Sequence, residues 1–268
     1  MIHTSISYLV FALSLVLGLL GCGDGSSGSG GSGGTAGSGG TAGVQTGTTT
    51  VTIVHLAPEI PAPGNTRLDI LVNGMAAIGS LHYGESTGRV TLEAGAYTFG
   101  LAAAGQSEAL TDFAATLEDG DDLTVVAYRT DYAPFVSLLF FNNSTAGLPS
   151  GEGRVVLGNG ANDSLLDPID LILTDDLACP PPLVAQVAFG TTAPSDKNLD
   201  LPQGTINLGV DRFPFDCYSM FDPLTVTVTP GVVSLLVLVD EDTTDEFLNP
   251  ELWAIVDASA SPVALISP

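Results

Sequence analysis

Residues 92–101 read LEAGAYTFGL, and residues 201–210 read LPQGTINLGV. In each stretch the fourth residue is a glycine, and the residues after it alternate between apolar side chains and small or polar ones. A period of two is typical of a strand that buries one face. Because the pattern occurs twice, about a hundred residues apart, it predicts a β-rich fold that is built as a repeat.

Three further blocks recur in the same order in both halves of the chain. These pairs are 68–71 with 169–172, 83–84 with 189–190, and 116–126 with 227–237. Four matched blocks in one order predict two domains of the same fold, at residues 51–147 and 152–268. The turn-rich segment Leu148-Pro149-Ser150-Gly151 is expected to join them.

Short apolar runs rich in Val, Leu, Ile, Thr and Phe recur about every ten residues, with Gly, Pro, Asn and Asp between them. The clearest runs are 50–56, 68–72, 89–92, 97–101, 123–129, 136–141, 155–157, 169–173, 184–189, 205–210, 224–229, 233–239 and 253–257. Helical periodicity does not persist anywhere in the chain. We therefore expect an all-β protein with two tandem Ig-like antiparallel β-sandwich domains.

The N-terminal residues predict export and a lipid anchor. Residues 9–20 (LVFALSLVLGLL) have the length of a signal-peptide core and are too few to span a membrane. This run ends in Leu19-Leu20-Gly21-Cys22, which resembles a bacterial lipobox, so we expect a signal peptide at residues 1–21 and lipid attachment at Cys22. An ordinary secretory signal or an uncleaved anchor is the alternative, because residues 1–8 contain no Lys or Arg.

Residues 22–50 comprise the lipid-modified cysteine and a linker of Gly, Ser, Thr and Ala. Such a linker buries too little surface to offset its ordering entropy, so it is expected to be disordered. Its root-mean-square reach is roughly 30 Å. The linker would hold the folded domains clear of the lipid headgroups, at the outer membrane or the cell surface.

The charge balance limits the classes of partner. The chain contains 6 Lys and Arg against 30 Asp and Glu, which gives a net charge of −24. Each phosphate contact needs a cation, so this balance argues against nucleic acid and against electrostatic docking on anionic lipid. We expect the lipid anchor to provide the membrane contact, and an extracellular protein or glycan to be any further partner.

Cys179 and Cys217 are the two cysteines of the folded region. In an oxidising compartment they are expected to form a disulfide, which would contribute roughly 4 kcal/mol in the chain-entropy model. Free thiols are the alternative. A catalytic thiol or a metal pair lacks support, because no histidine lies C-terminal to His82.

The first half resembles a known family. The segments that carry the resemblance are 51–59 (VTIVHLAPE), 68–74 (LDILVNG), 81–87 (LHYGEST) and 94–97 (AGAY). They are similar to the tandem β-sandwich modules of secreted bacterial proteins known as domain of unknown function 4397. The second half departs from that pattern, since Asn159-Gly160-Ala161-Asn162-Asp163 stands where the histidine run would be. The resemblance implies the fold and an extracytoplasmic location, and it implies no activity.

His55 is the residue best placed for acid–base chemistry, because it ends the first expected strand near Glu59. Its counterpart in the repeat is Asn159, whose side chain can also bond the backbone of the following turn. This exchange favours a structural role for both residues, with a binding role as the alternative. His82, whose counterpart is Ala188, is expected at the surface.

Sequence motifs for catalysis are absent: the chain has no Gly-x-Ser-x-Gly elbow and no Cys/His metal-ligand spacing. We therefore expect no enzyme activity, no metal and no cofactor. The carboxylates of residues 118–122 and 240–246 leave a calcium site as an alternative. The apolar run at 136–141 is expected to be a core or interdomain strand, because it is apolar on both faces.

These observations favour an envelope-anchored, non-enzymatic surface lipoprotein whose modules have a structural or binding role. A calcium- or carbohydrate-dependent adhesin and a hydrolase with an unrecognised site are the alternatives. Sandwich domains present their loops at the ends, so a ligand would be expected at loops such as 58–66 or 177–182.

Overall fold

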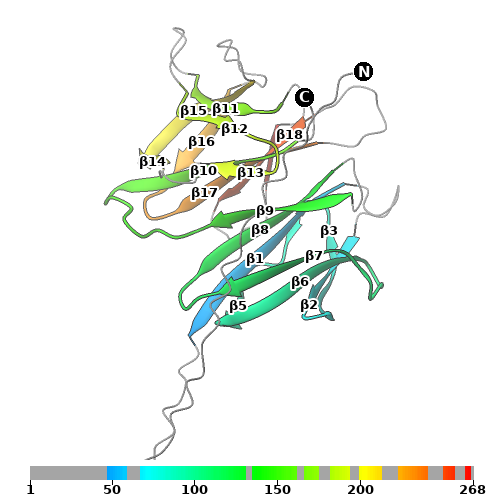
Figure 1. The fold of residues 1–268 in the computed structure, drawn as a ribbon. Coiled ribbons are helices and arrows are strands. Elements are labelled where there is room, and N and C mark those ends of the chain that lie inside the picture. The colour runs from blue at the N-terminus through cyan, green and yellow to red at the C-terminus, as the bar shows by residue number, and fades with distance from the viewer. Residues whose placement is uncertain are drawn as a thin grey trace, which may run out of the picture. The chain divides into compact units, whose positions relative to one another are not determined.

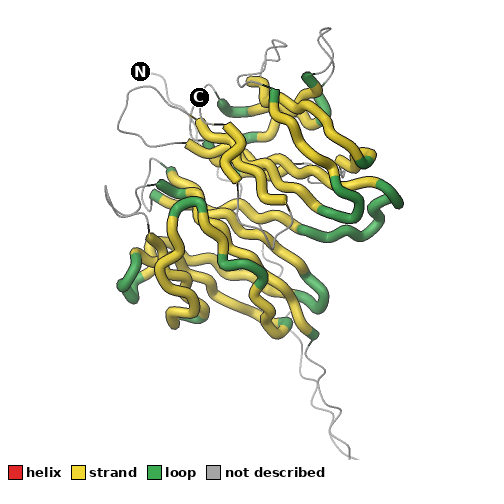
Figure 2. Tube along the Cα trace, turned by 180° about the vertical axis from the view of Figure 1, so that it is seen from behind, coloured by secondary structure: helices red, strands yellow, loops and turns green. Residues whose placement is uncertain are grey.

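The computed structural model describes residues 47–58, 67–130, 135–161, 166–174, 182–193, 199–212, 223–240, 250–256 and 263–266. All regular secondary structure in these ranges is β-strand, joined by turns and loops (Figure 2). The prediction of an all-β protein is confirmed. Residues 44–268 form one compact unit.

The strands divide into two similar halves. Those of the first half are β1 (Thr48–Leu56), β2 (Arg67–Val72), β3 (Met75–His82), β4 (Glu85–Ser86), β5 (Val90–Glu93), β6 (Gly95–Ala103), β7 (Ala109–Leu117), β8 (Asp122–Arg129) and β9 (Val136–Asn142). Those of the second half are β10 (Glu152–Gly160), β11 (Ile169–Leu173), β12 (Val184–Val187), β13 (Thr191–Ala193), β14 (Leu199–Pro202), β15 (Gly204–Arg212), β16 (Leu224–Val228), β17 (Val233–Asp240), β18 (Pro250–Val256) and β19 (Val263–Ile266).

Each half contains two sheets, and the strand order matches between the halves (Figure 1). In the first half the sheets are β4-β1-β8-β9, with β5 also paired to β1, and β3-β2-β6-β7. In the second half they are β13-β10-β17-β18-β19, with β14 also paired to β10, and β12-β11-β15-β16. The second half thus repeats the first and adds β19 beyond β18.

The prediction that the sandwiches are wholly antiparallel is wrong. β1 pairs in parallel with β8, and β10 pairs in parallel with β17. Parallel neighbours need a long crossover connection, and the intervening strands of the other sheet supply it in each half. Alternating apolar runs predict where a strand lies but not its direction, so the sequence pattern could not show this pairing.

The aromatic–glycine turns confirm the repeat that the sequence predicts. Gly84 donates its N–H to the carbonyl oxygen of His55 at 2.8 Å, and Gly190 donates to that of Asn159 at 2.8 Å. The φ angles of the two glycines are 77° and 73°. Glycine adopts this left-handed conformation at little cost, so the same residue type closes the same turn in both halves.

A buried aspartate supports the same bulge in each half. Ser80 and Gln186 have φ angles of 58° and 57°, which costs a non-glycine residue about 1–2 kcal/mol. Ser80 donates its N–H to Oδ1 of Asp69 at 2.6 Å, and Gln186 donates to Oδ1 of Asp170 at 2.6 Å. Bonds to a carboxylate are stronger than neutral ones, so the aspartates stabilise the strained residues.

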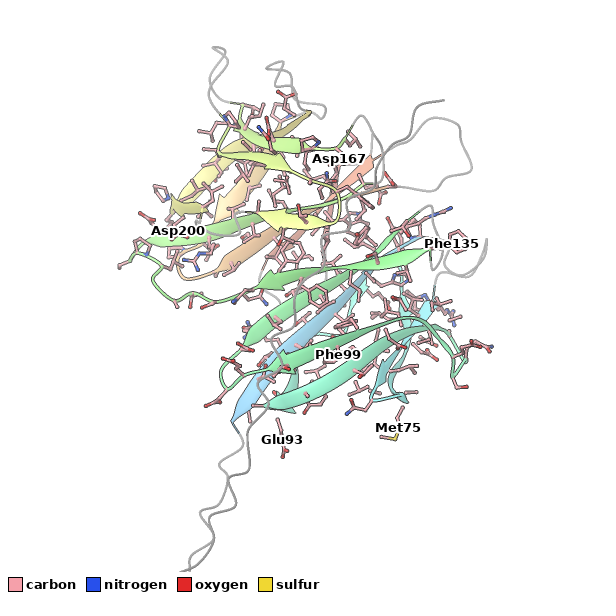
Figure 3. The ribbon with its side chains drawn as sticks, viewed as in Figure 1. Met75, Glu93, Phe99, Phe135, Asp167 and Asp200 are labelled. Carbon is pink, nitrogen blue, oxygen red and sulfur yellow. The ribbon has the colours of Figure 1, made fainter. Side chains whose placement is uncertain are left out.

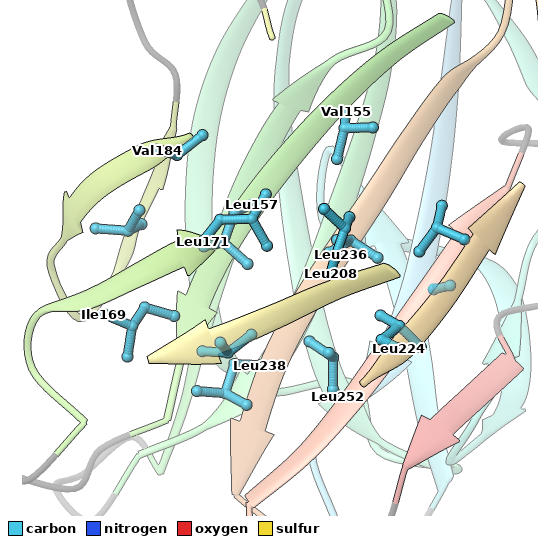
Figure 4. Packing of buried hydrophobic residues seen from close by; sticks show 14 of the residues in the cluster. Val155, Leu157, Ile169, Leu171, Val184, Leu208, Leu224, Leu236, Leu238 and Leu252 are labelled. Atoms are coloured by element: carbon cyan, nitrogen blue, oxygen red, sulfur yellow. The ribbon is translucent and has the colours of Figure 1, made fainter. Parts of the chain in front are cut away.

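Each half has a hydrophobic core between its two sheets. In the second half, Leu157 of β10 and Leu236 of β17 meet Leu171 of β11 and Leu208 of β15 (Figure 4). All four leucines are fully buried. Burying one leucine contributes roughly 1.5–3 kcal/mol, so these four positions account for much of the attraction between the sheets.

A third apolar cluster lies between the halves, and we call it the seam. It comprises Val54, Leu56, Val126, Tyr128, Leu139 and Phe141 of the first half, with Val156, Val233, Leu235, Val237, Val239, Trp253 and Ile255 of the second. Residues 136–141, predicted to be a core or interdomain strand, contribute to it through β9. β1, β8, β10 and β17 border the seam and are buried along most of their length, which explains their continuous apolar runs.

Gly158 of β10 faces the seam and has no room for a side chain. A Cβ at this position would lie 2.5 Å from Cζ of Phe141 and 3.1 Å from Cδ1 of Leu139. We expect Gly158→Ala to lower the free energy of unfolding by about 1–3 kcal/mol through overpacking. Urea denaturation followed by tryptophan fluorescence measures this change, since Trp253 lies in the seam.

Gly95→Ala is the matched control, because a Cβ at Gly95 would be 3.9 Å from its nearest neighbour, Cε2 of Tyr97. Its expected effect is within about 0.5 kcal/mol. If Gly158→Ala were as stable as this control, the close packing of the seam would be wrong.

Candidate functional site

His55 lies at the end of β1 and is fully buried. Its Nδ1 accepts a hydrogen bond from the backbone N–H of Ala57 at 3.2 Å. The edge of its ring meets the ring of Tyr83, with the centroids 6.2 Å apart and the planes at 87°. The ring therefore holds the chain where it leaves β1.

Asn159 occupies the same place in the second half and is also fully buried. Its Oδ1 accepts the N–H of Ala161 at 3.2 Å, as the ring nitrogen of His55 does for Ala57. Its Nδ2 donates to the carbonyl oxygens of Leu166 at 2.7 Å and Val187 at 3.1 Å. Both side chains thus accept a hydrogen bond from the backbone N–H two residues later. A structural role for His55 and Asn159 requires a bond of this kind.

Tyr83, which packs on the ring of His55, connects it to the carboxylate of Glu251. The Tyr83 hydroxyl donates to Oε2 of Glu251, and Nε1 of Trp253 donates to the same oxygen at 2.9 Å. The rings of Tyr83 and Trp253 pack edge to face at 5.5 Å. This group ties the turn of the first half to β18 and binds the halves together.

Phe189, the counterpart of Tyr83, makes the reciprocal contact. Its ring meets that of Tyr128 in β8 at 5.7 Å, with the planes at 86°. Burial raises the pKa of the Tyr128 phenol above its ordinary value, and the hydrogen bond with Ser137 opposes this shift. Each aromatic–glycine turn therefore packs on an aromatic residue of the other half.

His82 lies at the end of β3 and is half-buried. Its backbone N–H donates to Oε2 of Glu85 at 2.9 Å. Cys22, Cys179 and Cys217 lie outside the described residues, so the lipid attachment and the disulfide stay predictions. The loops at 58–66 and 177–182 also lie outside them, apart from Pro58 and Pro182.

The acidic turn between β7 and β8, which connects the two sheets of the first half, uses its carboxylates to bond the backbone. Oδ1 of Asp119 accepts the N–H of Thr48 at 3.0 Å, and Oδ2 of Asp121 accepts that of Glu118 at 2.7 Å. Within the described part of the chain, no group of three or more His, Cys, Asp or Glu residues is arranged to hold a metal ion. Of the second acidic segment, 240–246, only Asp240 is described.

A polar cleft of about 680 Å³ opens between the halves beside the segment that joins them. Its lining residues are Arg89, Gly120, Asp122, Asn143, Ser144, Thr145, Ala146, Gly231, Val232 and Val233. Nη2 of Arg89 pairs with Oδ2 of Asp122 at 2.7 Å, and Nδ2 of Asn143 donates to the other oxygen of that carboxylate at 3.0 Å. The cleft offers hydroxyl groups and one partly exposed guanidinium to a polar ligand.

Arg154 fixes one wall of this cleft. Its guanidinium donates to both carboxylate oxygens of Asp200, at 2.8 and 3.2 Å, and to the carbonyl oxygens of Ser144 at 2.6 Å and Ala146 at 3.4 Å. The side chain is only 5% exposed. Sequence reasoning missed Arg89 and Arg154, although the scarcity of cations in an acidic chain was a signal that could have singled them out.

The first half matches a described protein family. The model for a domain of unknown function, DUF4397, matches residues 49–167. Residues 49–167 are a DUF4397 domain. The matched segment contains strands β1 to β10 and ends before β11.

The resemblance seen in the sequence of the first half is thereby confirmed. The DUF4397 domain includes both His55 and Asn159, the two strand-end residues. A search of curated proteins found no match to the chain. Among the described residues, no helix is long and apolar enough to cross a membrane.

His55→Leu tests the strand-end bond. Leucine cannot accept the N–H of Ala57, so this buried donor would lose its partner at a cost of about 1–3 kcal/mol in the free energy of unfolding. His55→Asn keeps an acceptor of the kind that Asn159 provides, so we expect it to be the more stable of the two variants. Urea denaturation measures both. If His55→Asn lost as much stability as His55→Leu, the shared structural role would be refuted.

Proposed function

We propose that this protein is an exported, lipid-anchored, non-enzymatic module of the cell envelope that binds a partner outside the membrane. The lipobox at residues 19–22 and the Gly- and Ser-rich linker support the anchoring. The repeated pair of sheets in each half supports the further proposal that both halves are Ig-like. The binding role rests on one observation, the open edge of β9.

β9 is the last strand of its sheet among the strands that the structure describes. Two backbone hydrogen bonds show which residues in and beside β9 face β8. The N–H of Thr130 donates to the carbonyl oxygen of Phe135 at 3.0 Å, and the N–H of Asn143 donates to that of Asp122 at 2.8 Å. In an antiparallel pair, the backbone N–H and C=O groups of successive residues point alternately toward the partner strand and away from it. Because Phe135 and Asn143 point toward β8, every second residue between them does so too. The N–H and C=O groups of Leu138 and Phe140 therefore point away from β8.

The edge of β9 lacks the features that normally prevent strand addition. Its sequence, VSLLFFN, contains no charge and no proline, and it pairs with β8 without a register shift. Phe135 and Phe140 are 49% and 43% exposed, and Phe135 is seen beside the start of β9 in Figure 3. Long, flat, apolar edges tend to recruit another strand. The hydroxyl of Thr192 reaches the edge at the carbonyl oxygen of Phe140, at 3.3 Å.

The second half shows what can cover such an edge. β18 is the counterpart of β9, and β19 pairs with it in antiparallel orientation. β19 has the uncharged sequence VALI. By analogy, β9 accepts an extended, uncharged apolar segment of a partner protein, which pairs through the backbone as in β-strand addition.

A peptide with the sequence of residues 261–268, SPVALISP, serves as the probe for this edge. We expect millimolar peptide to slow amide hydrogen exchange at Leu138 and Phe140 in a saturable manner, because their N–H groups would gain acceptors. Leu138→Pro removes the outward N–H of residue 138, which an edge strand tolerates, together with a side chain that packs on the core of the first half. In the folded variant, the protection of Phe140 should be abolished. Absence of protection in the unmodified protein, or equal protection of Phe140 in folded Leu138→Pro, would refute binding at β9.

Cys22→Ser tests the anchor in the producing bacterium. Serine lacks the thiol that would carry the diacylglyceryl group, so we expect metabolic acyl labelling to be lost and the protein to leave the membrane fraction, since an acyl chain contributes about 0.8 kcal/mol per buried methylene. Ser26→Ala, in the linker, is the control and should leave both readouts unchanged. Labelling that persists in Cys22→Ser would contradict lipidation at this residue.

A further inference from the structure

An apolar cavity of about 140 Å³ lies between the two sheets of the first half. Each side chain that lines it is a hydrocarbon, from Ile53 and Ile70 in the buried interior to Val90 and Leu92 on β5. Ala77 of β3 also lines the cavity and is exposed to solvent, so the cavity opens at the side of the sandwich where β3 and β5 lie. A cavity of this kind offers apolar contact and no hydrogen-bonding side chain to whatever enters it.

One lining position on β5 carries a larger side chain in the second half. Val90 lies opposite Val51, and Leu199 lies opposite Val155, so Leu199 is the counterpart of Val90. Leu199 packs against the core of its half. Val90 lines the cavity instead.

The same contrast holds on the facing sheet. Ile78 lies opposite Ile70 of β2, and Val184 lies opposite Leu171 of β11. Since Ile70 and Leu171 are counterparts, Ile78 corresponds to Val184, and the preceding residues Ala77 and Leu183 correspond to each other. Leu183 packs against the core of the second half. Alanine at this place in the first half leaves that volume empty.

Three lining positions carry smaller side chains than their counterparts in the second half. Leucine has three more carbons than alanine and one more than valine, and Val72, which also lines the cavity, is replaced by Leu173. These three positions together carry five fewer carbons than their counterparts in the second half.

Two lining positions differ in the opposite sense, since Ile78 and Phe99 are larger than their counterparts Val184 and Leu208. The ring of Phe99 stacks on Phe113 of β7, with the centroids 5.1 Å apart and the planes at 14°. The ring of Phe99 thus forms the wall of the cavity that lies toward β7. The space near β3 and β5 stays open.

We propose that this cavity binds a compact apolar group, of the size of a phenyl ring or a branched alkyl chain, carried by a small-molecule ligand. The ligand would supply the hydrocarbon that Leu173, Leu183 and Leu199 supply in the second half. The chemistry that recognises it is shape and apolar contact, because the lining offers no polar side chain. This site lies within one half and does not depend on the proposed lipid anchor.

Benzene is the probe, and the compact unit 44–268 with ¹³C-labelled isoleucine methyl groups is the protein. We expect saturable chemical-shift changes at Ile53, Ile70 and Ile78, which line the cavity. Ile169 and Ile255 belong to the core of the second half and to the seam, so they should not shift.

Two reciprocal variants separate this site from nonspecific partitioning. Ala77→Leu fills the cavity and should abolish the saturable shifts while it raises the midpoint of unfolding. Leu183→Ala should create a second benzene site, with new shifts at Ile169. Val90→Leu gives an independent filling variant.

Three outcomes would overturn the proposal. The first is the absence of a saturable shift at every isoleucine methyl group of the first half. The second is shifts of equal size in both halves of the unmodified protein. The third is shifts in folded Ala77→Leu and Val90→Leu that equal those of the unmodified protein.

Discussion

The structure depends on burial of the seam, the apolar layer where the outward sheet face of one half packs on that of the other. Its side chains are almost all aliphatic or aromatic. β10 and β17 are buried along nearly their whole length because they pack on a core on one side and on the seam on the other. Interiors are packed at crystal-like density, so the two halves must keep complementary shapes.

This packing gives several local features a common cause. Gly158 and Gly160 leave space for Phe141 and Tyr128 of the other half. Gly84 lies against the ring of Trp253, 3.2 Å from where its Cβ would be. The glycines thus allow the turn to close and also allow the halves to approach. The polar contacts at the seam, such as the bonds to Glu251, lie where the apolar layer meets the aromatic turns.

Much of the fold could be predicted from the sequence because it depends on local periodicity. The alternation at 92–101 and its repeat at 201–210 predicted matching strands, and the observed registers align them as expected. β3 and β7 were not among the clearest predicted runs, because their residues are mostly small or partly exposed and give a weak apolar signal. The direction of β8 against β1 is a long-range property that local patterns do not encode.

The candidate site was predicted only in part. The repeat paired His55 with Asn159, and the structure gives both the same backbone bond. The roles of Asp69 and Asp170 were missed, although they stand in matching blocks, since an aspartate in an apolar strand can serve several purposes. Arg89, Asp122 and Asn143 of the polar cleft are distant from one another in sequence, and only the folded chain brings them together.

The most direct test of the seam is differential scanning calorimetry of residues 44–268. If the two halves depend on each other through the seam, they should unfold in one transition whose calorimetric enthalpy equals the van't Hoff enthalpy. Two separate transitions, each with the enthalpy of about a hundred residues, would show that the halves are independent domains and would contradict this account.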